Sequence, residues 1–230
     1  MTVPAGPSGI GAAAHAFVDD LDQPILAPED RHHLERVLRL RKGEPVTVSD
    51  GVGGWRPCTF GTRLEPEGEV TRDPAPEPPI TVAFALLKGE RPELVVQKLT
   101  ELGVDRIAPM VTARCVVHWT AVKSDRHAER LRRVAREAAM QSRRSWLPTV
   151  EEVRPFAEVA AHAESVLAET GGGPVTLDRP FVLVGPEGGW APEEAACGLP
   201  TVGLAPHILR AETAAIAAAT LLVAKRTSLV

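Results

Sequence analysis

A proline-rich segment at residues 73–79, DPAPEPP, divides the chain into two parts with different sequence patterns. Each proline fixes its own φ angle and lacks an amide donor, so this density of prolines predicts an extended, stiff connector. A chain of 230 residues has room for two domains of ordinary size. We therefore expect a first domain at residues 1–72, a linker at 73–79 and a second domain at 80–230.

The first part has the pattern of a small β-rich domain. Residues 45–60, PVTVSDGVGGWRPCTF, predict two short strands joined by a glycine-rich turn, and residues 68–72 predict a third strand. A helix-like stretch, HHLERVLRL at 32–40, precedes them. We expect these elements to form a barrel or a half-barrel.

The second part alternates between strand and helix patterns. Residues 80–87, ITVAFALL, have the apolar run of a buried strand, and residues 92–103, PELVVQKLTELG, predict a helix that ends at Gly103. Another strand pattern, VDRIAPMVT, follows at 104–112. Alternation of this kind indicates βαβ units and a parallel sheet, so the predicted fold class is α/β.

The rest of the chain continues this alternation. The segments that we expect are a helix at 126–142, an acidic, alanine-rich helix at 151–170, a GGG loop at 171–173, a strand at 181–184, a short helix begun by Pro192, a strand at 201–204 and a final helix at 212–226. In the first of these helices an apolar stripe at Leu131, Val134, Ala135, Ala138 and Ser142 leaves Arg132, Arg133 and Arg136 pointing away. The final helix is apolar almost all round, which predicts burial in the core or against another subunit.

Charge is distributed unevenly along the chain. The formal net charge of -4 argues against a protein that coats nucleic acid without specificity. Residues 123–144 nevertheless hold eight Lys/Arg against three acids, and residues 31–42 hold five against Glu35. Either block alone is commonly a solvated face. Two such blocks in an acidic chain favour a localised site for a polyanion.

The composition gives no sign of a metal site or a membrane segment. Cys58, Cys115 and Cys197 lie far apart, with no spacing typical of a zinc site or a disulfide framework, so we expect reduced thiols and no metal. The sequence has no apolar run of membrane-spanning length and no basic, signal-like N-terminus. We therefore expect a cytoplasmic protein.

Two loops after predicted strands carry the residues most suited to chemistry. GPEGG at 185–189 follows an apolar strand, and LAPHILRAETAA at 204–215 follows the next one. Ligands of open α/β sheets bind outside the carboxyl ends of the strands, so these loops are expected to line one pocket. GPEGG is neither a P-loop nor a dinucleotide fingerprint, and its acid, Glu187, suits a ligand that is cationic or donates hydrogen bonds.

Simpler interpretations of these residues remain open. Glu187 could be a surface acid in a turn whose glycines only shape the chain. Glu212 could complement the positive end of the final helix, and Thr213 could cap it.

Several separate motifs resemble the RsmE-type SPOUT methyltransferases. They are HHLERVLRLRKGE at 32–44, LLKGERPELVVQKLTELGVDRIAPMVTARC at 86–115, EAAMQSRRSWLP at 137–148, GPEGG at 185–189 and LAPHILRAETAA at 204–215. Enzymes of this family transfer a methyl group from S-adenosyl-L-methionine to N3 of a uridine in the decoding region of 16S ribosomal RNA. The resemblance implies a PUA-like β-barrel that binds RNA, followed by a SPOUT-type α/β domain with a parallel sheet and a deep trefoil knot. It also implies a homodimer with active sites at its interface, and the small ribosomal subunit as partner.

The same resemblance implies three groups of site residues. For catalysis we expect Glu212 as general base, Glu187 as the second candidate for that role, and Arg210 as the electrostatic partner of the developing oxyanion. The cofactor-binding residues are expected to be Leu183, Val184, Gly185, Pro186, Glu187, Gly188, Gly189, Leu204, Ala205, Pro206, Ile208, Leu209 and Thr213. The RNA-binding residues are expected to be Arg31, Arg36, Arg39, Arg41, Lys88, Arg114, Arg132, Arg133, Arg136, Gln141, Arg143, Arg144 and His207.

The second loop departs from the family pattern, which is close to LGPRILRTETA. This chain has Ala205 for Gly, His207 for Arg and Ala211 for Thr. If position 205 requires a positive φ angle, alanine costs about 1 kcal/mol there. These departures motivate a catalytically silent RNA-binding protein as an alternative function. A metabolic enzyme of Rossmann type is a further alternative; it predicts no effect of the basic blocks on activity, and it leaves a glycine loop without the dinucleotide fingerprint unexplained.

Overall fold

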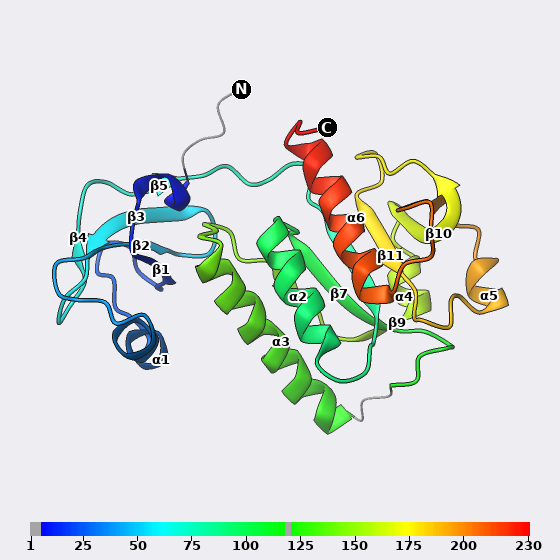
Figure 1. Ribbon diagram of the computed structural model, residues 1–230, viewed down its shortest axis with the longest axis horizontal. Coiled ribbons are helices and arrows are strands. Elements are labelled where there is room, and N and C mark those ends of the chain that lie inside the picture. The colour runs from blue at the N-terminus through cyan, green and yellow to red at the C-terminus, as the bar shows by residue number, and fades with distance from the viewer. Residues whose placement is uncertain (1–5, 118–120) are drawn as a thin grey trace. The chain divides into compact units, whose positions relative to one another are not determined.

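The computed structural model describes residues 6–117 and 121–230, without the side chains of residues 121–124, and it divides into two compact units (Figure 1). One unit comprises Met1–Ala75 together with Arg136–Leu147, and the other comprises Pro76–Ala135 together with Pro148–Val230. The predicted domain limits remain a prediction. The structure adds that a distant segment, Arg136–Leu147, belongs to the N-terminal unit.

The N-terminal unit is built on a small mixed sheet. Its elements are η1 (Pro7–Ile10), β1 (Ala14–Phe17), α1 (Pro28–His32), the π-helical turn η2 (His33–Val37), β2 (Pro45–Ser49), β3 (Gly54–Thr59), β4 (Glu65–Pro66) and β5 (Thr71–Arg72). The sheet order is β1-β2-β3-β4, with β5 also on β3; β1 pairs parallel with β2, and β2 pairs antiparallel with β3. The strands predicted within residues 45–60 and 68–72 are confirmed.

The segment Arg136–Leu147 is attached to this unit by polar contacts. Arg136 donates to both carboxylate oxygens of Asp30, at 2.7 and 2.6 Å, and its guanidinium lies 5.6 Å from the centre of the Phe17 ring. Arg136 therefore has a partner within this unit, and its predicted contact with RNA stays a prediction. The carboxylate of Asp30 is buried, and an unpaired buried charge is costly, so the arginine turns inward.

His15 contributes a second attachment. Its Nε2 lies 3.1 Å from the carbonyl oxygen of Arg144, and its Nδ1 lies 2.8 Å from the hydroxyl of Thr47. Because a carbonyl only accepts, Nε2–H donates to Arg144 and the neutral ring accepts from Thr47 through Nδ1. Burial lowers the pKa of His15 to about 4, a backbone bond to Arg144 opposes this shift, and the nearby charge of Arg143 adds to it.

The second unit is an α/β structure. Its elements are β6 (Thr81–Ala85), α2 (Arg91–Leu102), β7 (Arg106–Val111), α3 (Ala121–Gln141, whose last residues belong to the N-terminal unit), β8 (Thr149–Val150), β9 (Arg154–Pro155), α4 (Phe156–Ala160), β10 (Ser165–Gly173), β11 (Phe181–Val184), α5 (Pro192–Ala195), β12 (Thr201–Val202) and α6 (Ala211–Arg226). The sheet order is β12-β10-β11-β6-β7-β8, β9 also pairs with β7, and the pairings between these strands are parallel. The predicted α/β class with a parallel sheet is confirmed; the trefoil knot stays a prediction.

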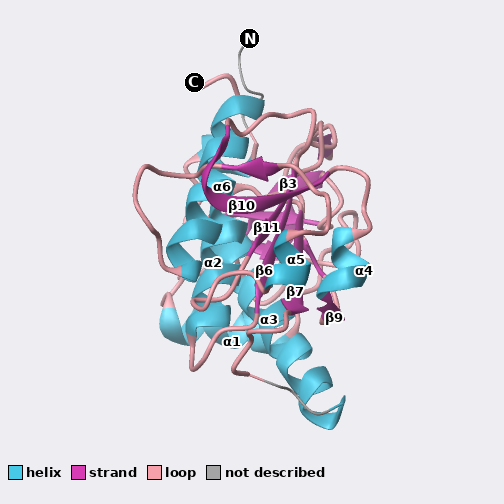
Figure 2. Ribbon diagram, turned by 90° about the vertical axis from the view of Figure 1, so that its right-hand side faces the viewer, coloured by secondary structure: helices cyan, strands magenta, loops and turns pink. Residues whose placement is uncertain are grey.

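The sheet has an apolar layer on each face. Val82 and Val182 pack with residues of α2 and α6, whereas their neighbours Ala83 and Leu183 pack with residues of α4. Side chains alternate between the two faces of a strand, so a strand covered on both faces is apolar throughout. Figure 2 shows α2 and α6 on one side of the strands and α4 on the other. None of the helices in the described residues is both long and apolar enough to span a bilayer.

The prediction of a helix at 151–170 followed by a glycine loop is wrong. Residues 165–173 form β10, which lies between β11 and β12, and only the short helix α4 precedes it. Pairing with two neighbours outweighs the helix propensity of the alanines. Gly172 allows the backbones of β10 and β12 to approach closely. A Cβ at this position would lie only 2.6 Å from the carbonyl carbon of Val202.

The C-terminal end of α6 is held by a buried arginine. Arg226, whose side chain is 9% exposed, forms an ion pair with Asp105 and donates to the carbonyl oxygens of Pro78 and Gly103 at 3.2 and 2.7 Å. Asp105 also accepts from the amide of Ile80 at 2.8 Å. These contacts connect the end of the final helix to the start of β6 and to the turn before β7.

Replacement of this arginine should destabilise the protein. Removing one partner of a buried ion pair costs about 3 kcal/mol or more, because the other charge stays buried with less compensation. We expect Arg226→Ala to lower the free energy of unfolding by this amount in urea denaturation. The control is Lys225→Ala at the exposed neighbouring position. Equal effects of the two replacements would show that the ion pair does not stabilise the fold.

Acid should destabilise the N-terminal unit through His15. The folded pKa of about 4 lies below the ordinary histidine value of 6.5, so between these values the unfolded chain binds a proton that the folded chain does not. Stability contributed by the neutral ring is present above pH 6.5 and is lost as the pH falls toward 4. One proton makes the slope of the unfolding free energy steeper by up to about 1.4 kcal/mol per pH unit.

We therefore expect His15→Gln to flatten the pH dependence of stability between pH 6.5 and 4, whatever its effect at neutral pH. Urea denaturation at several pH values measures this slope. The same replacement at the exposed His33 is the control. A His15→Gln variant with the slope of the unmodified protein would contradict the assignment.

Candidate functional site

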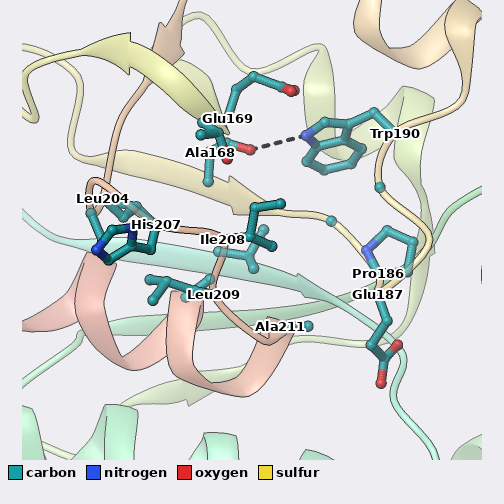
Figure 3. Close-up of a pocket in the computed structure, with 16 residues that line it drawn as sticks. Ala168, Glu169, Pro186, Glu187, Trp190, Leu204, His207, Ile208, Leu209 and Ala211 are labelled. Atoms are coloured by element: carbon teal, nitrogen blue, oxygen red, sulfur yellow. Dashed lines mark hydrogen bonds between the residues drawn. The ribbon is translucent and has the colours of Figure 1, made fainter.

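A cavity of about 170 Å³ lies at the carboxyl end of β11, beside the middle of β10 (Figure 3). The residues that line it come from three segments and are Ala168, Glu169, Thr170, Val184, Gly185, Pro186, Glu187, Gly189, Trp190, Leu204, Ala205, His207, Ile208, Leu209, Ala211 and Ala214. The prediction that the loops at 185–189 and 204–213 form one pocket is confirmed. Their chemical roles remain predictions.

Most residues predicted to bind a cofactor line this cavity, but some do not. The predicted residues absent from its lining are Leu183, Gly188, Pro206 and Thr213, and the catalytic candidates Arg210 and Glu212 are absent as well. Leu183 is fully buried in the layer beneath. His207, which we assigned to RNA, does line the cavity.

Sequence reasoning missed the wall formed by Ala168, Glu169 and Thr170. These residues lie in the middle of β10, where the sequence predicts a helix, so their position on a strand beside the cavity was not predicted. The apolar Ser-Val-Leu-Ala run at 165–168, directly before two polar residues, is the signal that could have identified the strand.

Trp190 fixes the shape of the loop that follows β11. Its ring lies against Gly185, where an added Cβ would be 3.1 Å from the ring, and its Nε1 donates to the carbonyl oxygen of Ala168 at 3.1 Å (Figure 3). Gly189 has a φ angle of 68°, and its amide donates to Pro186 at 2.9 Å. The glycines therefore permit a tight turn folded against its own tryptophan.

The two candidate bases have different surroundings. Glu187 forms an ion pair with Arg91, and Figure 3 shows its carboxylate pointing away from Trp190 and Ile208. The Oε2 atom of Glu212 is buried and has no hydrogen-bond partner among the described residues. Of the two candidate bases, Glu212 is thus the one with a buried carboxylate oxygen that can still accept a hydrogen bond.

The start of α6 gives no support to a capping role for Thr213. The N-cap position is Arg210, without a side-chain cap, and the Thr213 side chain is exposed. Glu212 does lie in the first turn, where an acid complements the positive helix end. This electrostatic role is compatible with a chemical one.

The departure at Ala205 carries no backbone strain. Among the described residues, those other than glycine with a positive φ angle are Arg39, Arg143 and Ser228. Ala205 is not one of them, so the cost of about 1 kcal/mol considered for a left-handed alanine does not arise here.

The predicted RNA-binding residues lie in both units and differ in exposure. Exposed residues are Arg36, Arg39, Arg41, Lys88, Arg114, Arg132, Arg133, Gln141 and His207, and half-buried residues are Arg31, Arg136, Arg143 and Arg144. Several have partners within the protein: Arg31 pairs with Glu35, Arg132 with Glu152, and Arg143 donates to Ala12. The side chain of Lys123, counted in the same basic block, lies outside the described residues.

Groups suited to a metal ion are missing from the part of the chain that the structure describes. No cluster of three or more His, Cys, Asp or Glu side chains there could hold one. Cys58 and Cys115 are buried, and burial raises the pKa of the Cys58 thiol to about 11. Cys197 is exposed.

Comparisons with known families agree with this architecture. Residues 74–223 match a family model described as an RNA methyltransferase domain, and residues 26–61 match one described as an RNA methyltransferase PUA domain. The first match covers the parallel sheet of the second unit and both loops of the cavity.

Individual relatives are also similar over most of the chain. A ribosomal RNA small subunit methyltransferase E from Mycobacterium bovis is 36% identical, over 84% of this chain and 83% of its own length. The protein of that name from Synechocystis is 35% identical, over 80% and 67% respectively. A structure from Legionella pneumophila, described as a methyltransferase with the bound cofactor SAM, is 28% identical, covers 92% of this chain and 97% of its own, and superposes with a TM-score of 0.79.

Proposed function

Because this chain belongs to the ribosomal RNA small subunit methyltransferase E family, we propose that it methylates N3 of a uridine in the decoding region of 16S ribosomal RNA, with S-adenosyl-L-methionine as donor. The observation that carries this proposal is the cavity shared by the loops at 185–190 and 204–209 within the matched RNA methyltransferase domain. The similar structure from Legionella pneumophila with bound SAM supports the choice of cofactor.

The residues of the cavity fit such a cofactor. Val184, Leu204, Leu209 and the Trp190 ring give apolar surface suited to an adenine base, and Glu169 brings negative charge to a site for a cationic ligand. When bound, S-adenosylmethionine supplies an electrophilic methyl carbon on a sulfonium. The chain's own contribution is to hold and orient, since positioning dominates a transfer of this kind.

The uracil N3 proton must be removed for N3 to act as nucleophile. We assign this proton to Glu212, whose buried Oε2 has no hydrogen-bond partner among the described residues, rather than to Glu187, which is paired with Arg91. The exposed guanidinium of Arg210, two residues before Glu212, is suited to stabilise negative charge spreading onto the uracil oxygens.

Substrate binding is assigned to the basic residues of both units. A target base must leave its stack before N3 is reachable, and the PUA-like unit and the basic part of α3 would hold the surrounding phosphates. We keep the homodimer and the cytoplasmic location as parts of the proposal, since an enzyme of this kind acts where small ribosomal subunits are assembled.

The direct test uses small ribosomal subunits that lack the modification. We expect the protein to transfer labelled methyl groups to their RNA, and primer extension to stop at one uridine, because methylation at N3 blocks base pairing. Binding of S-adenosylmethionine without transfer to any RNA would contradict the proposed activity. RNA binding without cofactor binding would instead support a catalytically silent protein.

Two replacements test the assigned chemistry. We expect Glu212→Gln to lower the rate of methyl transfer about 100-fold or more, the scale of a general base, while cofactor affinity changes little. Arg210→Ala should lower the same rate about 10-fold or more through lost charge stabilisation. Calorimetry with S-adenosylmethionine and single-turnover transfer assays measure the two quantities separately.

The matched control is Glu164→Gln, an exposed acid of the same unit that does not line the cavity. Glu187→Gln separates the two candidate bases. Normal transfer by Glu212→Gln together with a large loss in Glu187→Gln would reverse the assignment.

A further inference from the structure

A buried carboxylate outside the cavity joins the two loops that follow β7 and β11. Glu194 in α5 is 8% exposed. Its Oε1 accepts from the amide of Ala113 at 2.7 Å, and its Oε2 accepts from the amide of Ala191 at 2.9 Å. Two backbone donors on two oxygens suit the ionised form, which only accepts. One side chain thus satisfies amides from segments about eighty residues apart.

The bond to Ala191 has a local origin. Glu194 is the third residue of α5, and a Glu at this position reaches back to the amide of the N-cap residue. The N-cap here is Ala191, which has no side-chain acceptor to return the contact. Helix formation alone therefore accounts for one carboxylate oxygen, and the bond to Ala113 is an additional, long-range contact.

Arg114 makes the opposite connection. Its guanidinium donates to the carbonyl oxygen of Gly188 at 2.8 Å. The turn that carries Arg114 is closed by the amide of Cys115 donating to Thr112 at 3.1 Å. A side chain of each loop region thus bonds to the backbone of the other, and the segment 188–191 is held at both ends.

We propose that Glu194 and Arg114 are positioning residues, which hold the loop after β11 in the shape that forms the cavity. That loop contributes five lining residues, from Gly185 to Trp190, but neither Glu194 nor Arg114 lines the cavity itself. This inference rests on the proposed function, because the cavity is taken to hold S-adenosylmethionine. It gives Arg114 a role other than the RNA contact predicted from the sequence.

The two positions differ in how they tolerate change. Glu194 is buried, and its two oxygens accept from two backbone amides. In Glu194→Gln the side-chain oxygen can still accept from one of these amides, whereas the side-chain NH2 group faces the other donor and cannot accept from it. Arg114 is exposed, so Arg114→Ala removes the bond to Gly188 without leaving a buried charge. The arginine variant therefore tests the idea even if the glutamate variant folds poorly.

We expect each variant to weaken S-adenosylmethionine binding about ten-fold, which corresponds to about 1.4 kcal/mol. The KM for the cofactor should rise by a similar factor while kcat at saturating cofactor stays within about two-fold, because bound cofactor restores the loop. Glu193→Gln, at the exposed neighbouring acid, should match the unmodified protein. Calorimetry, steady-state kinetics and thermal unfolding measure affinity, the KM and kcat split, and stability.

A loss of kcat with an unchanged KM for the cofactor would overturn the positioning role. A fall in cofactor affinity that disappears when the affinity is corrected for the fraction of folded protein would overturn it as well. For Arg114→Ala, unchanged cofactor affinity with weaker RNA binding would return this residue to the RNA-binding group. Weaker cofactor binding with RNA affinity retained supports the proposal.

Amide hydrogen exchange of the free protein separates this inference from the proposed function. The amides of Ala113 and Ala191 should exchange slowly in the unmodified protein and at least ten-fold faster in Glu194→Gln, with or without any cofactor. If the unmodified protein binds no S-adenosylmethionine, the proposed function fails. Faster exchange of these two amides in Glu194→Gln would still establish that Glu194 connects the two loops. Equal exchange in both proteins would overturn the connection itself.

Discussion

The close approach of β10 and β12 at Gly172 determines where the site can form. A side chain at this position would place its Cβ 2.6 Å from the backbone of Val202, so the two strands can pair here only through glycine. This pairing places β10 between β11 and β12. The loop that leaves β12 therefore meets the loop that leaves β11, and the middle of β10 forms a wall of the cavity that they share. A different strand order would separate these three segments.

Local patterns predicted the parts of the molecule in which neighbours in sequence decide the structure. The apolar run at 181–184 identifies a strand, and the alternation of strand and helix patterns along the second part of the chain predicts the parallel sheet. The pattern at 151–173 was misread because alanines favour a helix locally, whereas pairing with two strands decides the outcome. The loops of the cavity were predicted, but the wall from β10 was not, since it depends on that long-range pairing.

The basic residues illustrate the same limit. Counting charges located the basic blocks correctly, but a count does not distinguish an arginine that binds a partner molecule from one that stabilises the fold. Arg136 pairs with buried Asp30, more than a hundred residues earlier in the chain, and Arg226 pairs with Asp105. Arg133, three residues earlier in the same basic block, is exposed. The structure thus reduces the set of arginines available to RNA phosphates.

Glu194, Glu187 and Glu212, three of the carboxylates near the cavity, have different environments, and these differences support the separate roles that we propose for them. Glu194 uses both oxygens for backbone amides, so it is committed to holding the loop. Glu187 is half-exposed, and its carboxylate is paired with Arg91. Glu212 has a buried oxygen without a hydrogen-bond partner among the described residues. A buried acceptor left unsatisfied is costly, and a proton donor arriving with the substrate relieves that cost. The free energy released on satisfying this oxygen would favour substrate binding and proton transfer together, which is why Glu212 rather than the more conspicuous acid of the GPEGG motif is the assigned base.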